Sequence, residues 1–188
     1  MRIIDLIKSF FEQPPDAERL SRWRGMFHAL ADSRVAPRID EAVLHIKRRL
    51  ATDRLQDLQV EFNCLFGLPG GNGSLSLAAA DHLDGRVHSD TQTAVKYYFS
   101  EAGARTYCPI GDRENSLVLL FDFLATLIQN EKDGYDTVVL QTQLVTDFLV
   151  PFVECLEVAA QQHDAASFYR DCLTFTRGYL ELEQQLLT

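Results

Sequence analysis

Apolar residues recur at helical intervals along almost the whole chain, and strand-like alternation of apolar and polar residues is nearly absent. Near the C-terminus the intervals are 4, 3, 4, 3 and 4 residues, in the series Phe168, Cys172, Phe175, Tyr179, Leu182 and Leu186. Such a series places one buried stripe along one face of a helix. The pattern therefore predicts an all-α fold.

The same spacing recurs in earlier segments, and residues that favour turns separate these segments. Two further apolar faces are Leu55, Leu58, Phe62, Leu65 and Phe66, and Leu117, Leu120, Phe121, Leu124, Leu127 and Ile128. Between such faces, Asp16 is a candidate helix cap and Gly67 a candidate C-cap. Pro151 lies inside a long helical segment and predicts a kink or a helix junction. About nine amphipathic helices are expected.

The length and composition are those of one ordinary globular domain. The chain has 188 residues, of which 46% are hydrophobic and 24% charged, so neither disorder nor a fibrous class is indicated. The glycine-rich residues 67–73 resemble a linker but are too short to separate independent domains. Residues 1–188 are therefore expected to form a single-domain helical bundle.

Cysteine usage and hydropathy point to the cytoplasm. No apolar run approaches the 18 or more residues that a membrane span requires, so stable membrane insertion is not expected. The four cysteines lie far apart, without a Cys-x-x-Cys pair or the Cys/His spacing of a zinc site; they are Cys64, Cys108, Cys155 and Cys172. They are interpreted as reduced packing residues of a cytoplasmic protein.

The net charge of −9 is distributed unevenly along the chain. Residues 1–106 contain 14 basic and 14 acidic residues, whereas residues 107–188 contain 4 basic and 13 acidic residues. A negative field argues against binding nucleic acid phosphates and favours basic partners, although acidity more often serves only solubility.

Catalytic and metal-binding patterns are weak. None of the five histidines stands in Glu-x-x-His or His-Glu-x-x-His, and Glu41 with His45 supplies too few groups for a metal site. Residues 67–74 lack the lysine of a phosphate-binding loop and follow a helix rather than a strand. Asp81-His82 has no partner nearby in sequence. Neither an enzyme nor a bound cofactor or metal is therefore predicted. The remaining function class is the binding of a peptide in an apolar groove with charged rims.

Several segments resemble the TorD/DmsD/NarJ group of redox-enzyme maturation chaperones, in the same order over roughly residues 50 to 187. The first segment is Glu61–Gly70, which contains a Leu-Phe-Gly-Leu-Pro-Gly element, and the second is Gly85–Gly103. The third is Pro109–Arg113 together with the helix that follows it and contains Phe123-Leu124-Ala125-Thr126-Leu127. The fourth is Phe148–Phe152 and the last is Ala166–Arg170. The family has an Asp-His pair before this helix. Alignment of that pair on Asp112 puts Arg113 in place of the histidine, whereas alignment by counting back from Phe123-Leu124 puts Asn115-Ser116 at the pair. The aromatic that follows the glycine loop in the family is also missing. A divergent member is implied.

The resemblance implies a cytoplasmic chaperone that binds the twin-arginine signal peptide, or the apo-form, of a molybdopterin-containing oxidoreductase precursor. Such a chaperone delays export and assists cofactor insertion without retaining the cofactor. The predicted peptide-binding residues are Phe62, Leu65, Phe66, Pro109, Asp112 and Glu114. Each has a structural alternative, since the first three share a helical face typical of a core and Asp112 is placed to cap the following helix.

Two other functions are left open. The first is a helical adaptor that binds a mature-region subunit of a membrane-associated redox enzyme, as some relatives of this group do. The second is a nucleotide-dependent factor, for which no phosphate-binding motif in the sequence gives support. Neither the client enzyme nor a homodimeric state is determined by the sequence.

Overall fold

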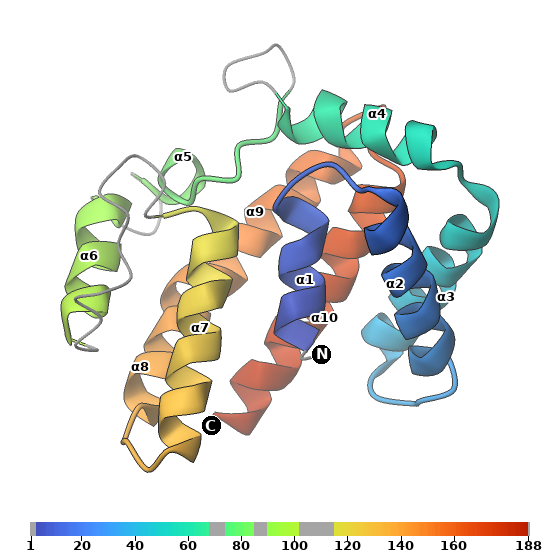
Figure 1. Ribbon diagram of the computed structural model, residues 1–188. Coiled ribbons are helices and arrows are strands. Elements are labelled where there is room, and N and C mark those ends of the chain that lie inside the picture. The colour runs from blue at the N-terminus through green and yellow to red at the C-terminus, as the bar shows by residue number, and fades with distance from the viewer. Residues whose placement is uncertain (1–2, 68–73, 85–89, 102–114, 188) are drawn as a thin grey trace. The chain divides into compact units, whose positions relative to one another are not determined.

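The computed structural model describes residues 3–67, 74–84, 90–101 and 115–187. In these segments the elements are α1 (Ile3–Phe11), α2 (Ala17–Leu30), α3 (Pro37–Thr52), α4 (Leu55–Phe66), α5 (Ala80–Leu83), α6 (Thr91–Glu101), α7 (Leu117–Lys132), α8 (Val138–Gln143), the π-helix η1 (Leu144–Leu149), α9 (Val150–Gln161) and α10 (Phe168–Leu186) (Figure 1). An isolated β-bridge joins Ala78 and Ser116, and the described segments contain no β-strand. The all-α prediction is confirmed.

The chain divides into two compact units. Unit 1 comprises Met1–Leu75 and Leu156–Tyr179, and unit 2 comprises Ser76–Cys155 and Leu180–Thr188. Both boundaries in the second half of the chain fall inside helices, namely α9 and α10. The expectation of a single folding domain stays a prediction.

An aromatic core fills unit 1. The Trp23 indole stacks on Phe168 at 5.6 Å between ring centroids and meets the Phe10 ring edge-on at 5.2 Å. Its Nε1–H donates to Ser9 Oγ at 2.7 Å, so this fully buried indole keeps a hydrogen-bond partner. Phe175 of α10 packs against Phe10 as well. The helices α1, α2 and α10 are therefore held together by ring contacts.

The start of α2 is held by a cap and a buried cation. Asp16 accepts a hydrogen bond from Arg19 N at 2.7 Å, which confirms the predicted cap. The Arg19 guanidinium, only 6% exposed, donates to the carbonyls of Ser9 and Gln13 and pairs with Glu12 at 3.3 Å. A cation near the last carbonyls of α1 complements the helix dipole there.

The helix α3 packs beside α2 in unit 1 (Figure 1), and its Ile39 lies close to Gly178 of α10. A Cβ on Gly178 of α10 would lie 2.7 Å from Ile39 Cγ1, so the glycine permits this approach. Burial raises the pKa of Asp171 even though His45 and Arg49 lie 3.7 Å from its carboxylate and lower it. Desolvation therefore outweighs these two ion pairs.

The core of unit 2 is built around α7. Its buried side chains are Leu117, Leu120, Phe121, Phe123, Leu124 and Leu127. Phe99 of α6 stacks on Phe123 at 4.2 Å, and Tyr98 meets Phe148 of η1 edge-on at 5.2 Å. Ser116 is the N-cap of α7 and accepts from Leu119 N at 3.3 Å. The described parts of the second, third and fourth segments of the resemblance, on α6, α7 and η1, thus pack against one another.

The junction predicted at Pro151 is present as a change of helix type. The π-helix η1 ends at Leu149, and the N–H of Val150 donates to the carbonyl of Val145, five residues earlier. Proline cannot donate a backbone hydrogen bond, and its ring clashes with the carbonyl four residues before it. A wider turn immediately before Pro151 relieves that clash, as is typical of π-segments inside α-helices.

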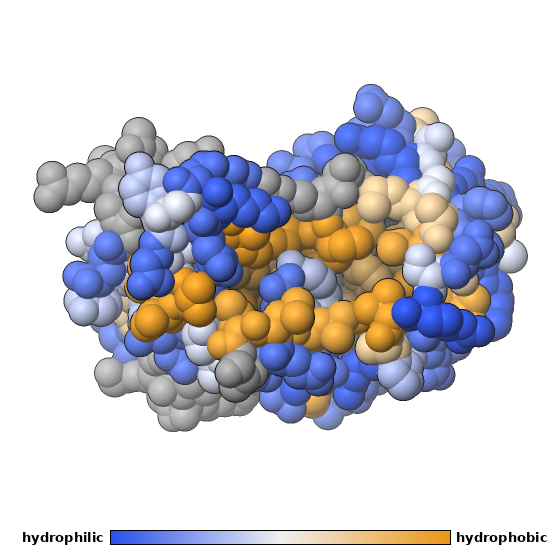
Figure 2. Space-filling view, turned by 90° about the horizontal axis from the view of Figure 1, so that it is seen from below, coloured by the Kyte–Doolittle hydropathy of each residue, from blue (hydrophilic) through white to orange (hydrophobic). Residues whose placement is uncertain are grey.

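The surface carries apolar as well as charged side chains, and Figure 2 shows apolar surface bordered by polar surface on one face. The most exposed large apolar residue of the described segments is Leu186, at 81%. The predicted stripe of α10 is buried at Phe168, Cys172 and Phe175 but does not remain buried to its end. In the described part of the chain, every helix is too short or too polar to span a bilayer.

Candidate partner-binding site

Two of the predicted peptide contacts lie in the core of unit 1. Phe62 is 6% exposed and Leu65 is fully buried, whereas Phe66, one turn after Phe62, is half-buried. The Phe66 ring contacts those of Phe62, Tyr169 and Phe11 at centroid distances of 5.3, 5.5 and 5.9 Å. On α4, Phe66 is therefore the most exposed member of this set. The binding role of all three stays a prediction.

The first and last segments of the resemblance meet at a helix start. Glu61 Oε1 accepts hydrogen bonds from the backbone N–H groups of Ser167 at 2.7 Å and Tyr169 at 2.9 Å. Ser167 immediately precedes α10 and Tyr169 lies in its first turn, where N–H groups lack partners within the helix. A carboxylate at this place is also favoured by the helix dipole. Glu61 is therefore a helix cap supplied by α4.

The Tyr169 side chain completes this cluster. Its ring packs on Phe62 at 5.6 Å, and its hydroxyl is buried without a hydrogen-bond partner among the described residues. Burial, followed by the charges of Cys172 and Glu61, raises the pKa of the Tyr169 hydroxyl far above its usual value of 10.0. The phenol is thus neutral and keeps an unused donor in the core.

Pro109, Asp112 and Glu114 lie outside the described residues. The predicted groove that joins them to α4 stays a prediction. The alternative role of Asp112 as a helix cap likewise stays a prediction; the described N-cap of α7 is Ser116.

The turn between α7 and α8, at residues 131–139, is acidic and apolar and was not predicted as a site from the sequence. Tyr135 is 68% exposed, Val139 65% and Val138 37%. Three exposed carboxylates accompany them in residues 131–139, on Glu131, Asp133 and Asp136. The signal available in the sequence was an apolar group placed directly after Gly134, outside any helical stripe.

The turn is held in a defined conformation. Gly134 has a φ of 95°, and its N–H donates to the carbonyl of Glu131, while Tyr135 N donates to Asn130 O at 3.0 Å. This pair of bonds is a Schellman motif, in which only glycine adopts the positive φ without strain. Thr137 Oγ1 donates to Leu127 O at 2.8 Å and joins the start of α8 to α7. Tyr135 is therefore exposed on an ordered turn.

Among the described residues, no three acidic, histidine or cysteine side chains lie close enough to hold a metal ion. Burial raises the pKa of Tyr98, assisted by Asp147 beside it.

Comparison with known proteins gives the family. No individual curated protein matches the sequence significantly. The profile of the family described as nitrate reductase delta subunit matches residues 32–157, more than half of the 188-residue chain. The match includes helix α4, helix α7 and the turn that follows α7. The chain therefore belongs to the nitrate reductase delta subunit family, which confirms the resemblance to the TorD/DmsD/NarJ group and indicates a redox-enzyme maturation chaperone.

Proposed function

We propose that this chaperone acts in the cytoplasm, where it binds the twin-arginine signal peptide of a molybdopterin-containing oxidoreductase precursor until the enzyme is assembled. The observation that carries the proposal is the family match over residues 32–157. The chaperone would assist cofactor insertion without retaining the cofactor itself.

The turn at residues 131–139 supports this proposal as a receptor surface. A twin-arginine leader presents basic residues followed by an apolar stretch. The turn offers carboxylates on Asp133 and Asp136 beside the exposed Tyr135, Val138 and Val139. Desolvated apolar contacts supply most of the affinity of such an interface, and complementary charge selects the orientation of the ligand.

Fewer of the peptide-binding residues predicted from the sequence are proposed to contact the leader. Phe66 is the proposed contact on α4, because Phe62 and Leu65 are covered by other side chains. Asp112 and Glu114 remain proposed partners for the basic part of the leader.

Titration calorimetry with a synthetic twin-arginine leader tests the receptor surface. We expect the double change Tyr135→Ser with Val139→Ser to weaken binding by about tenfold or more, because two exposed apolar contacts are lost. Asp133→Asn with Asp136→Asn removes two exposed charges, so a weaker, salt-dependent loss of about two- to tenfold is expected. Val60→Ser, equally apolar and 61% exposed on α4, is the matched control.

Charge reversal at Asp112 and Glu114 tests the acidic residues predicted from the sequence. Reversal should weaken leader binding, because the basic part of the leader would then meet cations. Several leaders that give neither heat nor competition would contradict the signal-peptide function altogether.

A second candidate function is favoured by the matched family itself, which is described as a nitrate reductase subunit. In that case the chain would be an adaptor for the mature region of a redox enzyme subunit. A pull-down that recovers the mature subunit but not a leader fusion would select this function over the first.

A further inference from the structure

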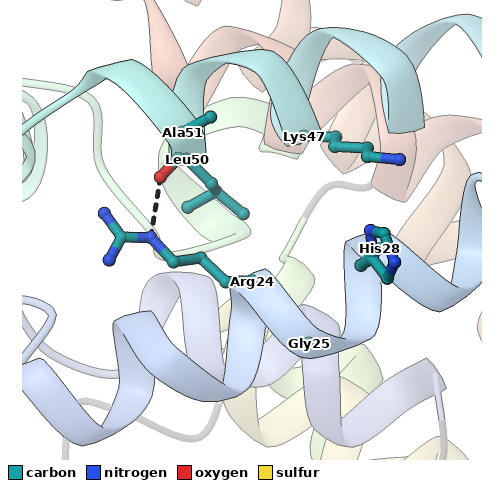
Figure 3. Close-up of a pocket in the computed structure, with 6 residues that line it drawn as sticks. All are labelled: Arg24, Gly25, His28, Lys47, Leu50 and Ala51. Carbon is teal, nitrogen blue, oxygen red and sulfur yellow. Dashed lines mark hydrogen bonds between the residues drawn. The ribbon is translucent and has the colours of Figure 1, made fainter.

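A pocket opens between α2 and α3 within unit 1. Its volume is about 430 Å³, and its lining residues are Arg24, Gly25, His28, Lys47, Leu50 and Ala51 (Figure 3). This volume lies in the range of pockets that hold small organic ligands, roughly 300 to 1,000 Å³. It exceeds what a single ion fills.

Gly25 keeps the floor of this pocket bare. It lies in the interior of α2, where glycine is less favourable than alanine. Its φ is not positive, and a Cβ built on it would meet nothing within 4 Å. Neither backbone conformation nor packing against the protein therefore requires glycine here. The consequence of the missing side chain is open space at the pocket.

The polar groups of the lining are all cationic or able to become so. Arg24 Nε donates to the Leu50 carbonyl at 2.7 Å, which holds the guanidinium while its two terminal nitrogens stay available. Figure 3 shows Lys47 and His28 at one end of the pocket and Arg24 at the other, with Gly25 between them. No carboxylate lines the pocket, and none of these three side chains forms an ion pair within the described segments.

This set of groups selects the chemistry of a ligand. A phosphate monoester carries about −1.5 to −2 charges near pH 7, which matches two or three cations better than the single charge of a carboxylate does. Arginine and lysine are the usual side chains that bind phosphate oxygens. Ala51 and the bare backbone at Gly25, which are both exposed, leave room for an apolar or flat body.

We propose that this pocket binds a phosphorylated organic small molecule. The phosphate lies at the Lys47 and His28 end, the body covers Gly25 and Ala51, and an acceptor atom of the body faces Arg24. The pocket is lined by other residues than those proposed for leader binding, so the two proposals succeed or fail independently.

Calorimetry on the full-length protein at low salt tests the proposal with three probes. They are 1-naphthyl phosphate, inorganic phosphate, and 1-naphthoate, which keeps the flat body but carries one charge. We expect 1-naphthyl phosphate to bind one to one, at least about tenfold more tightly than either of the others, because only it supplies both the body and the dianion. Equal binding of 1-naphthoate, or no binding of 1-naphthyl phosphate, would overturn the proposal.

Variants locate the binding within the pocket. Gly25→Leu fills the pocket with a good helix former, so binding should be lost while the melting temperature does not fall. Lys47→Ala and Arg24→Ala should each weaken binding about tenfold or more, because each removes a charged hydrogen-bond donor. Arg48→Ala changes an exposed cation outside the lining and should leave binding unchanged. Retained binding in Gly25→Leu, or an equal effect of Arg48→Ala, would refute this site.

Discussion

Removal of the Glu61 carboxylate should destabilise the protein because one oxygen satisfies two N–H groups at the start of α10. These hydrogen bonds are 2.7 and 2.9 Å long, and the donors are Ser167 and Tyr169. Loss of a helix cap costs about 0.5 to 2 kcal/mol, and a hydrogen bond to a charged group contributes roughly 1.5 to 3 kcal/mol. Glu61 is half-buried, so water replaces part of the loss. We expect Glu61→Ala to lower the free energy of unfolding by about 2 to 3 kcal/mol.

Glu61→Gln separates hydrogen bonding from charge. The amide oxygen can still accept from both N–H groups, so only the interaction of the charge with the helix start is lost, about 0.5 to 1 kcal/mol. Urea unfolding followed by circular dichroism measures these differences, with the exposed Glu41→Ala as the control, expected within about 0.5 kcal/mol of wild type. The capping interpretation fails if Glu61→Ala behaves like Glu41→Ala, or if Glu61→Gln is as damaging as Glu61→Ala.

Four further substitutions test the packing and electrostatics of unit 1. Phe62→Ala should lower the unfolding free energy by about 3 to 5 kcal/mol in calorimetry, as expected for a buried ring; a loss below about 1 kcal/mol would contradict its burial. Gly178→Ala should destabilise by about 1 to 2 kcal/mol in urea unfolding because its Cβ would meet Ile39, whereas Gly25→Ala, with open space around it, should stabilise by up to about 1 kcal/mol; effects of the same sign would refute this contrast. Burial holds the pKa of Asp171 above 3.8 in the folded state, so between 3.8 and the folded pKa the folded chain binds more protons than the unfolded chain. The stability advantage of wild type over Asp171→Asn should therefore decrease as the pH rises through that interval, and unfolding curves at a series of pH values that show an increase would contradict this sign.

The helices and several of their ends could be predicted from the sequence because helix formation depends on residues near one another. Asp16 caps α2 as predicted. The helix type changes before Pro151 because proline cannot donate a backbone hydrogen bond and its ring clashes with the preceding turn. The family, too, follows from short motifs in a fixed order. Spacing cannot determine whether an apolar face is covered by the protein or left for a partner, and for this reason Phe62 and Phe66 could not be told apart.

The sequence by itself determined an all-helical chain with an acidic second half and the motifs of a maturation chaperone. Only the tertiary structure decided that Glu61 caps a helix more than 100 residues later, that Tyr135 stands exposed on an ordered turn, and that Gly25 lies at the floor of a pocket lined by cations. Periodicity is a property of one helix at a time. Contacts between residues far apart in the chain depend on how helices dock, which is set by the shapes of many side chains together.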